Sequence, residues 1–258
     1  MKADVLVAEI GSTTTLINAF CGIRSGEPKF IGQGQAPTSV LEGDVRIGLN
    51  GAIEDLKANL GADKIEYGEM LATSSAAGGL RMCVHGLVYD MTVKAAEAAA
   101  LGAGAIVTMA TAGKLSEYDI EDLKEAKPNL ILLAGGTDYG EKETALFNAR
   151  MIAASGVKAP VIYAGNVQNK RAVEDIFQKA GISCTVTENV YPKLDKLNIE
   201  PARKIIHQVF EEHIIKAPGM EHIRDMVTGH IMPTPGAVME AVQLAYNEIG
   251  DVVAVDIG

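Results

Sequence analysis

The sequence predicts an α/β protein, and two observations carry this prediction. Short apolar segments alternate with amphipathic ones in the middle of the chain, where strands are expected at 130–134, 161–164 and 183–187 and helices at 142–154 and 168–180. Such alternation is typical of parallel strands joined by crossover helices. The 258 residues also include 27 glycines, no tryptophan and only 5% aromatic residues, which indicates a core of Ala, Val, Ile and Leu with many tight turns.

The chain begins with a predicted hairpin. Residues 5–8 and 16–20 are short apolar runs separated by Gly-Ser-Thr-Thr-Thr, and a third run at 29–33 is expected to extend the same sheet. Apolar positions between 45 and 60 recur at steps of three and four, as on one face of an amphipathic helix. Gly61 is expected to end that helix.

Five further elements are expected before the regular alternation begins. They are strands at 70–73 and 80–88, a helix at 91–101, a strand at 105–110 and a helix at 116–126. Asp90 is expected to cap the first of these helices, because a short side-chain oxygen accepts from free backbone N–H groups in the first turn.

The last part of the chain is predicted to be mostly helical. Helices are expected at 201–216 and 235–249, the second with Thr234 as its N-cap. A closing strand at 252–256 repeats the opening one, since Asp-Val-Leu-Val-Ala-Glu-Ile-Gly near the start aligns with Asp-Val-Val-Ala-Val-Asp-Ile-Gly at the end. Both an internal duplication and a chance likeness of apolar strands remain open.

Charge and composition exclude several classes of partner. The 23 basic and 33 acidic residues give a net charge of −10, which disfavours binding to nucleic acid or to an anionic membrane. No apolar run reaches the roughly 20 residues that span a bilayer, and no signal peptide is recognised, so a cytoplasmic protein is expected. Its three cysteines form no CxxC pair, which argues against a disulfide framework or a cysteine zinc site.

The first turn carries the clearest chemistry. A strand ends in the carboxylate of Glu9, Gly11 permits a close backbone approach, and four hydroxyl residues follow. Such a turn offers N–H and O–H donors to phosphate oxygens, and the carboxylate would hold Mg²⁺ directly or through water. An ordinary hairpin, in which the hydroxyls bond their own backbone, is the alternative.

The residues of this turn, together with other motifs of the chain, resemble those of a known protein family. A strand ending in Glu-Ile-Gly-Ser-Thr-Thr, repeated near the end as Val-Asp-Ile-Gly, resembles the acetate and sugar kinase/Hsp70/actin superfamily, in which ATP lies between two lobes. Together with Thr-Ser-Ser-Ala-Ala-Gly-Gly-Leu-Arg-Met, Leu-Ala-Gly-Gly-Thr-Asp and Pro-Thr-Pro-Gly-Ala-Val, it looks like the MutL/GlmL family. Those proteins accompany adenosylcobalamin-dependent mutases and are distinct from the mismatch-repair protein of similar name.

The resemblance implies an ATP-dependent, chaperone-like accessory or reactivating factor for a glutamate or ornithine mutase. Mutase subunits and a nucleotide are the implied partners, a homo-oligomer stays open, and whether the chain is itself an ATPase also stays open. Two alternatives remain on the same scaffold. One is a small-molecule kinase, and the other is a non-catalytic module that binds a protein or a corrinoid.

The resemblance also assigns residues. It makes Gly11, Ser12, Thr13, Thr14 and Thr15 the first phosphate-binding turn of an ATP and Mg²⁺ site. Glu9 and Asp256 take the catalytic and metal positions. Glu9 stands where the superfamily usually has aspartate, and the extra methylene shifts a carboxylate that octahedral Mg²⁺ needs well placed. This departure affects the prediction of ATP hydrolysis more than that of nucleotide binding.

A second candidate loop comprises Gly135, Gly136, Thr137 and Asp138. It follows a predicted strand and precedes a helix, where open α/β sheets place ligand loops. A structural turn and a functional loop are both open. As a functional loop it would hold a nucleotide-like or cobalamin-related group, or contact the mutase. The segment from Thr73 to Arg81 is another hydroxyl-rich and glycine-rich loop, in which Arg81 would bind a phosphate or carboxylate. A surface salt bridge beside a tight turn is the alternative.

Four regions are expected from this resemblance and the element pattern. A first actin-like ATPase (ribonuclease H-like) lobe is predicted at 1–127, a parallel α/β unit at 128–190, a helical segment at 191–250, and the first strand of a truncated second lobe at 251–258. The chain alone is therefore expected to hold only half of the nucleotide cleft and to be inactive by itself.

Overall fold

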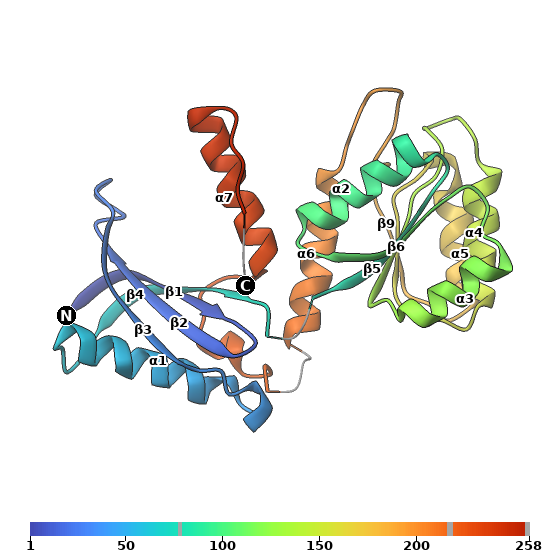
Figure 1. Cartoon of the computed structure of the whole chain (residues 1–258). Helices are drawn as coiled ribbons and strands as arrows, with labels where there is room; N and C mark the ends of the chain where they lie inside the picture. The colour runs from blue at the N-terminus through green and yellow to red at the C-terminus, as the bar shows by residue number, and fades with distance from the viewer. Residues whose placement is uncertain (77–78, 216–218, 256–258) are drawn as a thin grey trace. The chain divides into compact units, whose positions relative to one another are not determined.

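The computed structural model describes residues 1–76, 79–215 and 219–255 and divides the chain into two compact units (Figure 1). Unit 1 combines Met1–Gly79 with Val209–Gly258, and unit 2 comprises Leu80–Gln208. Each unit is built on its own five-stranded sheet. The α/β class is confirmed, since both sheets contain parallel strands and carry helices.

Unit 1 contains a mixed sheet with the strand order β10-β4-β1-β2-β3. Its strands are β1 (Lys2–Ile10), β2 (Thr14–Cys21), β3 (Lys29–Pro37), β4 (Glu66–Ser74) and β10 (Ile231–Pro233). β1, β4 and β10 run parallel, whereas β2 pairs antiparallel with both β1 and β3. Ile10 lies opposite Ser74, and Ser74 lies opposite Pro233. The three parallel strands therefore end together at one edge of the sheet.

Helix α1 (Val45–Leu60) packs against one face of this sheet (Figure 1). Alternate residues of β1, Leu6, Ala8 and Ile10, are buried beneath it, as expected for a strand with one covered face. The approach is close, because a Cβ on Gly34 would lie 2.1 Å from the Ala52 carbonyl oxygen. The predicted hairpin, third strand and helix are confirmed, and the helix ends at the predicted glycine in a left-handed conformation.

The C-terminal part of unit 1 differs from the predicted helical segment. Between α6 (Glu200–Ile215) and α7 (Thr234–Ile249) lie the short helix η4 (Ile223–Asp225) and strand β10, which joins the sheet beside β4. β10 was not predicted, since three residues give no periodicity and its last residue is proline. Pro233 is the N-cap of α7, so Thr234 is the first helical residue and not the cap.

The predicted closing strand is not formed where the structure describes it. Residues 252–255 adopt no regular structure, and the exposed fractions of Val253 and Val255 are 91% and 76%. An apolar segment becomes a strand only when a neighbouring strand pairs with it, and no described strand does so here. Asp256 and Gly258 lie outside the described residues.

Unit 2 contains an all-parallel sheet with the order β6-β5-β7-β8-β9. Its strands are β5 (Arg81–Gly86), β6 (Ile106–Ala112), β7 (Leu130–Leu133), β8 (Val161–Tyr163) and β9 (Cys184–Val186). The alternation predicted for 130–187 is confirmed. The structure divides the chain differently from the predicted boundaries at 127 and 190, because β5 pairs with both β6 and β7. Residues 80–127 thus fold with the parallel unit.

Helices cover both faces of the second sheet (Figure 1). On one side lie α3 (Glu117–Ala126), α4 (Glu143–Ala154) and α5 (Lys170–Lys179), which share a buried core with β5, β7 and β8. On the other lie α2 (Lys94–Gly102) and the first part of α6. No helix among the described residues has the length and apolar character needed to cross a membrane.

The predicted role of Asp90 as a helix cap is wrong. A single π-helical turn, η2 (Tyr89–Val93), precedes α2, and the Thr92 hydroxyl accepts from the N–H groups of Leu87 and Val88. Asp90 instead forms an ion pair of 2.6 Å with Lys94 one turn later. A threonine hydroxyl buried inside the turn satisfies the free N–H groups, which leaves the aspartate on the surface.

Candidate functional site

The first turn joins β1 to β2 and is held by its own backbone. The Gly11 N–H donates to the Thr14 carbonyl oxygen at 3.0 Å. A Cβ at position 11 would lie 2.8 Å from that oxygen, so the turn requires glycine. Ser12, Thr13 and Thr14 are exposed. Their hydroxyls therefore face solvent at the edge where β1 ends.

Thr15 stands apart from the other predicted phosphate-binding residues. Its side chain is fully buried, and its hydroxyl lies 2.9 Å from that of Thr38. The Thr38 N–H donates to the Thr13 carbonyl oxygen at 2.9 Å. Thr15 thus supports the turn from below, and residues 12–14 remain as the surface that a ligand would meet.

Glu9 lies on the sheet face opposite α1. Its neighbours on β1, Ala8 and Ile10, are buried under the helix, whereas Glu9 itself is half-buried on the other face. In the sheet register it lies between Leu16 on β2 and Thr73 on β4. The carboxylate therefore stands one residue before the end of β1, beside the hydroxyl of a neighbouring strand.

Two other segments reach the same edge of the first sheet. After β4, the Ser74 hydroxyl donates to the Ile10 carbonyl oxygen at 3.2 Å, and the Ser75 N–H donates to the same oxygen at 3.0 Å. After β10, the Thr234 hydroxyl is buried and has no hydrogen-bond partner among the described residues. The ends of β1, β4 and β10 thus bring three hydroxyl-bearing segments together.

Thr234 is the residue whose role here the sequence analysis missed. It was predicted as a helix cap, but it opens α7 with its hydroxyl buried and unsatisfied. A buried polar atom without a partner costs free energy, and it often marks a place where a water, an ion or a ligand binds. The signal that would have pointed to it is its position in the Pro-Thr-Pro-Gly motif, after a short apolar run.

The predicted metal residues do not form a closed site. Among the residues that the structure describes, no three His, Cys, Asp or Glu side chains converge. Glu9 is the one predicted metal residue that is described, since Asp256 lies outside the described residues.

The second candidate loop lies at the carboxyl end of β7, in unit 2. Gly135 and Gly136 are buried, and a Cβ at position 136 would lie 2.6 Å from the Glu141 carbonyl oxygen. The glycines therefore let the loop fold tightly onto itself. Tyr139, at its tip, is 78% exposed and has a positive φ of 62°, which is unusual for a residue with a bulky side chain.

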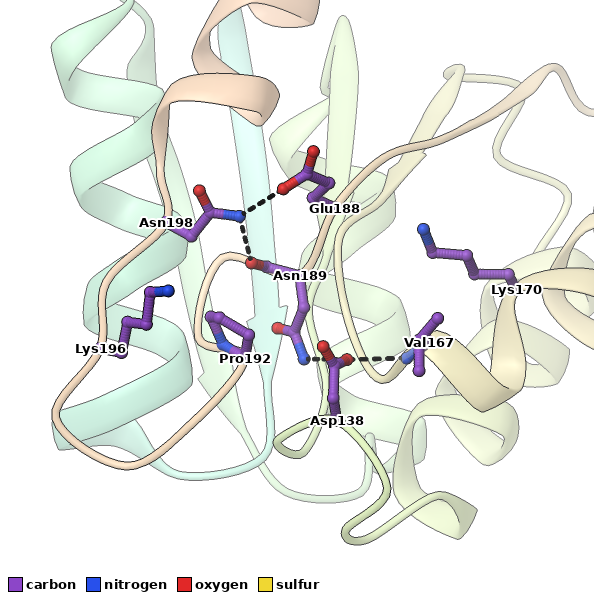
Figure 2. A pocket seen from close by; sticks show the side chains of 8 residues that line it. All are labelled: Asp138, Val167, Lys170, Glu188, Asn189, Pro192, Lys196 and Asn198. Carbon is purple, nitrogen blue, oxygen red and sulfur yellow. Dashed lines mark hydrogen bonds between the residues drawn. The ribbon is translucent and has the colours of Figure 1, made fainter.

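Asp138 ties this loop to the ends of β8 and β9 (Figure 2). Its Oδ1 accepts from the Val167 N–H at 2.9 Å and from the Asn189 side-chain amide at 3.1 Å. Its own N–H donates to the Pro192 carbonyl oxygen at 3.0 Å. Asp138 therefore joins three loops that follow three neighbouring parallel strands.

Two buried asparagines complete this network. Asn166 accepts from the N–H groups of Tyr139 and Gln168 and donates to the carbonyl oxygens of Gly140 and Glu141. Asn189 donates to the Gly136 carbonyl oxygen at 3.0 Å. Neither was predicted, although each lies two residues after the end of a predicted strand. The side-chain amides form hydrogen bonds with backbone N–H and C=O groups of these loops, in place of the backbone partners that a regular helix or strand would provide.

A pocket of about 290 Å³ opens where these loops meet (Figure 2). Its lining is polar, with two lysines, two carboxylates and two amides among its eight residues: Asp138, Val167, Lys170, Glu188, Asn189, Pro192, Lys196 and Asn198. Its position agrees with the rule that open α/β sheets bind ligands at the carboxyl ends of their strands. Thus Asp138 faces a pocket, whereas Gly135 and Gly136 lie buried behind it.

His85 is a buried titratable group outside both candidate sites. It lies in β5, and its Nδ1 is 2.7 Å from the Thr111 hydroxyl on β6. Its Nε2 is buried without a hydrogen-bond partner among the described residues. Burial lowers the pKa of His85 to about 4, from an ordinary value of 6.5. The ring is therefore neutral at physiological pH.

The chain is similar to proteins of one known family. A family model described as MutL protein matches residues 5–258. Protein MutL of Clostridium tetanomorphum is 44% identical over 226 residues, which cover 85% of this chain and 49% of that protein. The chain thus spans about half the length of this relative.

One solved structure is also similar in outline. A chain of acetone carboxylase, described as the nucleotide-free structure in a study of ATP-dependent acetone carboxylation, matches 96% of this chain and 35% of its own length. The identity is 17% and the TM-score is 0.37. We base no conclusion on a likeness at this level.

Proposed function

The chain belongs to the MutL protein family, and on that premise we propose that it is an ATP-dependent, chaperone-like accessory or reactivating factor for an adenosylcobalamin-dependent aminomutase of the glutamate or ornithine mutase type. One structural observation carries the nucleotide part of this proposal. Three hydroxyl-bearing segments, after β1, β4 and β10, meet at one edge of the first sheet.

The phosphate groups of the nucleotide would bind at the first turn. Residues 12–14 present their hydroxyls to solvent there. The Thr234 hydroxyl, at the start of the 16-residue helix α7, has no hydrogen-bond partner in the part of the chain that the structure describes. A helix N-terminus carries a partial positive charge and free N–H groups, which favour a bound anion. Both features support a phosphate at this edge.

Magnesium would bind beside the same turn through Glu9. Mg²⁺ in nucleotide sites keeps several waters and takes only one or two carboxylates, together with phosphate oxygens. A single half-buried glutamate next to a hydroxyl-rich turn fits that donor set, whereas an all-protein cage does not occur among the described residues. When bound, the ion would neutralise phosphate charge, and Glu9 would orient its water ligands.

The actin-like character of unit 1 is part of the proposal. Its sheet begins with a hairpin whose turn carries one glycine and exposed hydroxyl residues, as a phosphate-binding lobe of that superfamily requires. Mg·ATP would then change the affinity for the mutase by favouring one arrangement of the full protein over another. A coupling of about 1–3 kcal/mol between the two binding events is typical of such systems.

A non-catalytic binding module is the second candidate, and one observation favours it. Unit 2 is a compact parallel α/β unit with its own pocket at Asp138. It would contribute recognition of a partner or a small molecule without any turnover of nucleotide. Under this alternative, the exposed hydroxyls of the first turn would have no ligand.

Nucleotide binding is tested by calorimetric titration of Mg·ATP into the protein and into two variants. Thr13→Ala removes an exposed hydroxyl of the first turn. Ser25→Ala removes a hydroxyl from the turn between β2 and β3, at the opposite end of β2, where among the described residues it donates to the Gly22 carbonyl oxygen. We expect Thr13→Ala to weaken binding and Ser25→Ala to leave it unchanged. Because this chain spans about half the length of the clostridial relative, the titration uses the protein extended to that full length, and absence of binding to that folded protein would overturn the nucleotide-dependent function.

The reactivating role needs a separate assay. A holo-mutase inactivated by oxygen is incubated with the protein, ATP and fresh adenosylcobalamin, and its turnover is then measured, with the full-length clostridial relative run in parallel. Recovery only when all three are present supports the proposal. Equal recovery without ATP or without the protein contradicts it.

A further inference from the structure

We propose that the pocket at Asp138 binds a small zwitterionic molecule, which carries one anionic group and one ammonium group. This inference is independent of the nucleotide proposal, because the pocket lies wholly in unit 2 and the first turn lies in unit 1. It rests on the rigidity of the pocket, the charges that face it and its size.

The floor of the pocket is prearranged. Asn189 is only 3% exposed, and its amide donates to both Gly136 and Asp138 while its carbonyl oxygen accepts from the Tyr191 N–H. The Val167 N–H donates to the same oxygen of Asp138, Oδ1, at 2.9 Å. These bonds keep the carboxylate in place without a ligand, so that little ordering is required when one binds.

Two ammonium groups face the pocket. Lys170, at the start of α5, and Lys196, in the loop before α6, extend toward its centre from opposite sides (Figure 2). In the described part of the chain neither lysine forms an ion pair. Both are therefore available to a carboxylate or phosphate group of a ligand.

Two carboxylates face the same space. Asp138 uses Oδ1 for both of its side-chain bonds, and Glu188 uses Oε2 to accept from Asn198 at 3.0 Å. Each retains one oxygen with no hydrogen bond within the described ranges. The four charged groups sum to zero, so a simple anion would meet two carboxylates as well as two lysines. A ligand with charges of both signs satisfies all four.

The size of the pocket limits the ligand. Its volume of about 290 Å³ lies at the lower end of the roughly 300–1,000 Å³ typical of small-molecule sites. It suits a small metabolite and is too small to enclose a corrinoid. The exposed position of Glu188 and Lys196 at the rim leaves the entrance open to solvent.

The test uses phosphoethanolamine and β-alanine as zwitterionic probes. Inorganic phosphate, propionate and ethanolamine are their single-charge partners, which carry charge of one sign only. Each is titrated into the whole protein by calorimetry. We expect at least one zwitterion to bind about tenfold more tightly than its single-charge partners. Lys170→Gln and Glu188→Gln should each weaken its binding about tenfold, since each removes one charge-assisted contact.

A matched control comes from the other end of α5. Lys179 is exposed, lies outside the pocket, and should tolerate Lys179→Gln with no change in affinity. The lysine and glutamate substitutions leave the buried amide network intact, so thermal unfolding should be unchanged. The proposal is overturned if neither zwitterion binds better than its partners, or if Glu188→Gln leaves the affinity for the zwitterion unchanged or raises it, which would identify a plain anion site.

Discussion

The hydroxyls of Thr15 and Thr38 lie 2.9 Å apart beneath the first turn, and they connect the start of β2 to the residue that follows β3. The Thr38 backbone also donates to Thr13 inside the turn. The shape of the turn is therefore set by the neighbouring strand and exists before any ligand binds. Thr15 and Thr38 therefore fix the shape of the turn, whereas the exposed residues 12–14 would contact a ligand.

Thr15→Val should cost stability and spare nucleotide binding. The substitution keeps the shape of the buried side chain but leaves the Thr38 hydroxyl unpaired, so we expect a loss of about 1 kcal/mol in the free energy of unfolding. Urea denaturation measures this loss, and calorimetry measures the affinity for Mg·ATP. A folded Thr15→Val protein that no longer binds nucleotide would show that Thr15 itself contacts phosphate.

Thr234→Val should weaken nucleotide binding without a loss of stability, which is the reverse of the effect expected for Thr15→Val. Because its buried hydroxyl has no partner among residues 1–76, 79–215 and 219–255, an apolar residue of the same shape should leave the free energy of unfolding unchanged or raise it by up to about 1 kcal/mol. The affinity for Mg·ATP should fall. The control is Thr228→Val, since Thr228 accepts a hydrogen bond from the Met70 N–H and its loss should lower stability alone.

Asn166→Ala should destabilise unit 2 strongly. This buried side chain makes four hydrogen bonds that connect the loops after β7 and β8. At about 1 kcal/mol each, with incomplete additivity, we expect a loss of about 3 kcal/mol in urea unfolding. Asn18→Ala, which breaks one exposed bond to Gln33, should change stability by less than about 0.5 kcal/mol. Similar effects of the two substitutions would contradict the assigned role of Asn166.

His85 should make the protein sensitive to acid. Its pKa in the folded protein is about 4 because burial disfavours the charged ring, whereas the unfolded chain takes up a proton near 6.5. The unfolded state therefore binds more protons between these values. The stabilisation is fully present above pH 6.5 and is lost as the pH falls toward 4, by about 3 kcal/mol in total.

The measurement for His85 is the free energy of unfolding from pH 7.5 to 4.5. His85→Gln, which cannot titrate, should flatten the profile relative to the wild type. Equal slopes for the wild type and His85→Gln would show that His85 does not stay neutral on folding.

Arg224→Ala should cost more than the loss of a surface ion pair. Glu211 is 7% exposed, and its two oxygens contact Arg224 Nη2 and His230 Nδ1, each at 2.8 Å. Removing Arg224 leaves the buried carboxylate with the His230 contact as its remaining side-chain hydrogen bond among the described residues, so we expect a loss of about 1–3 kcal/mol in urea unfolding. Arg24→Ala, whose 3.5 Å pair with Glu69 is exposed, should change stability by less than about 1 kcal/mol.

Local patterns in the sequence determined most of the secondary structure. The helix at 45–60, the opening hairpin and the alternating strands and helices of residues 130–187 follow from periodicity, glycine and capping residues, which act over a few positions. The candidate turn and the loop at Asp138 were identifiable for the same reason. Their glycines and hydroxyls stand directly after apolar strands.

Only the tertiary structure decided how these elements combine. β10 becomes a strand because it pairs with β4, more than 150 residues earlier, and β5 joins the second sheet because it lies between β6 and β7. The roles of Asn166, Asn189 and Thr234 depend on which atoms surround them after folding. Pairing and burial are set by distant parts of the chain, and a local pattern does not contain that information.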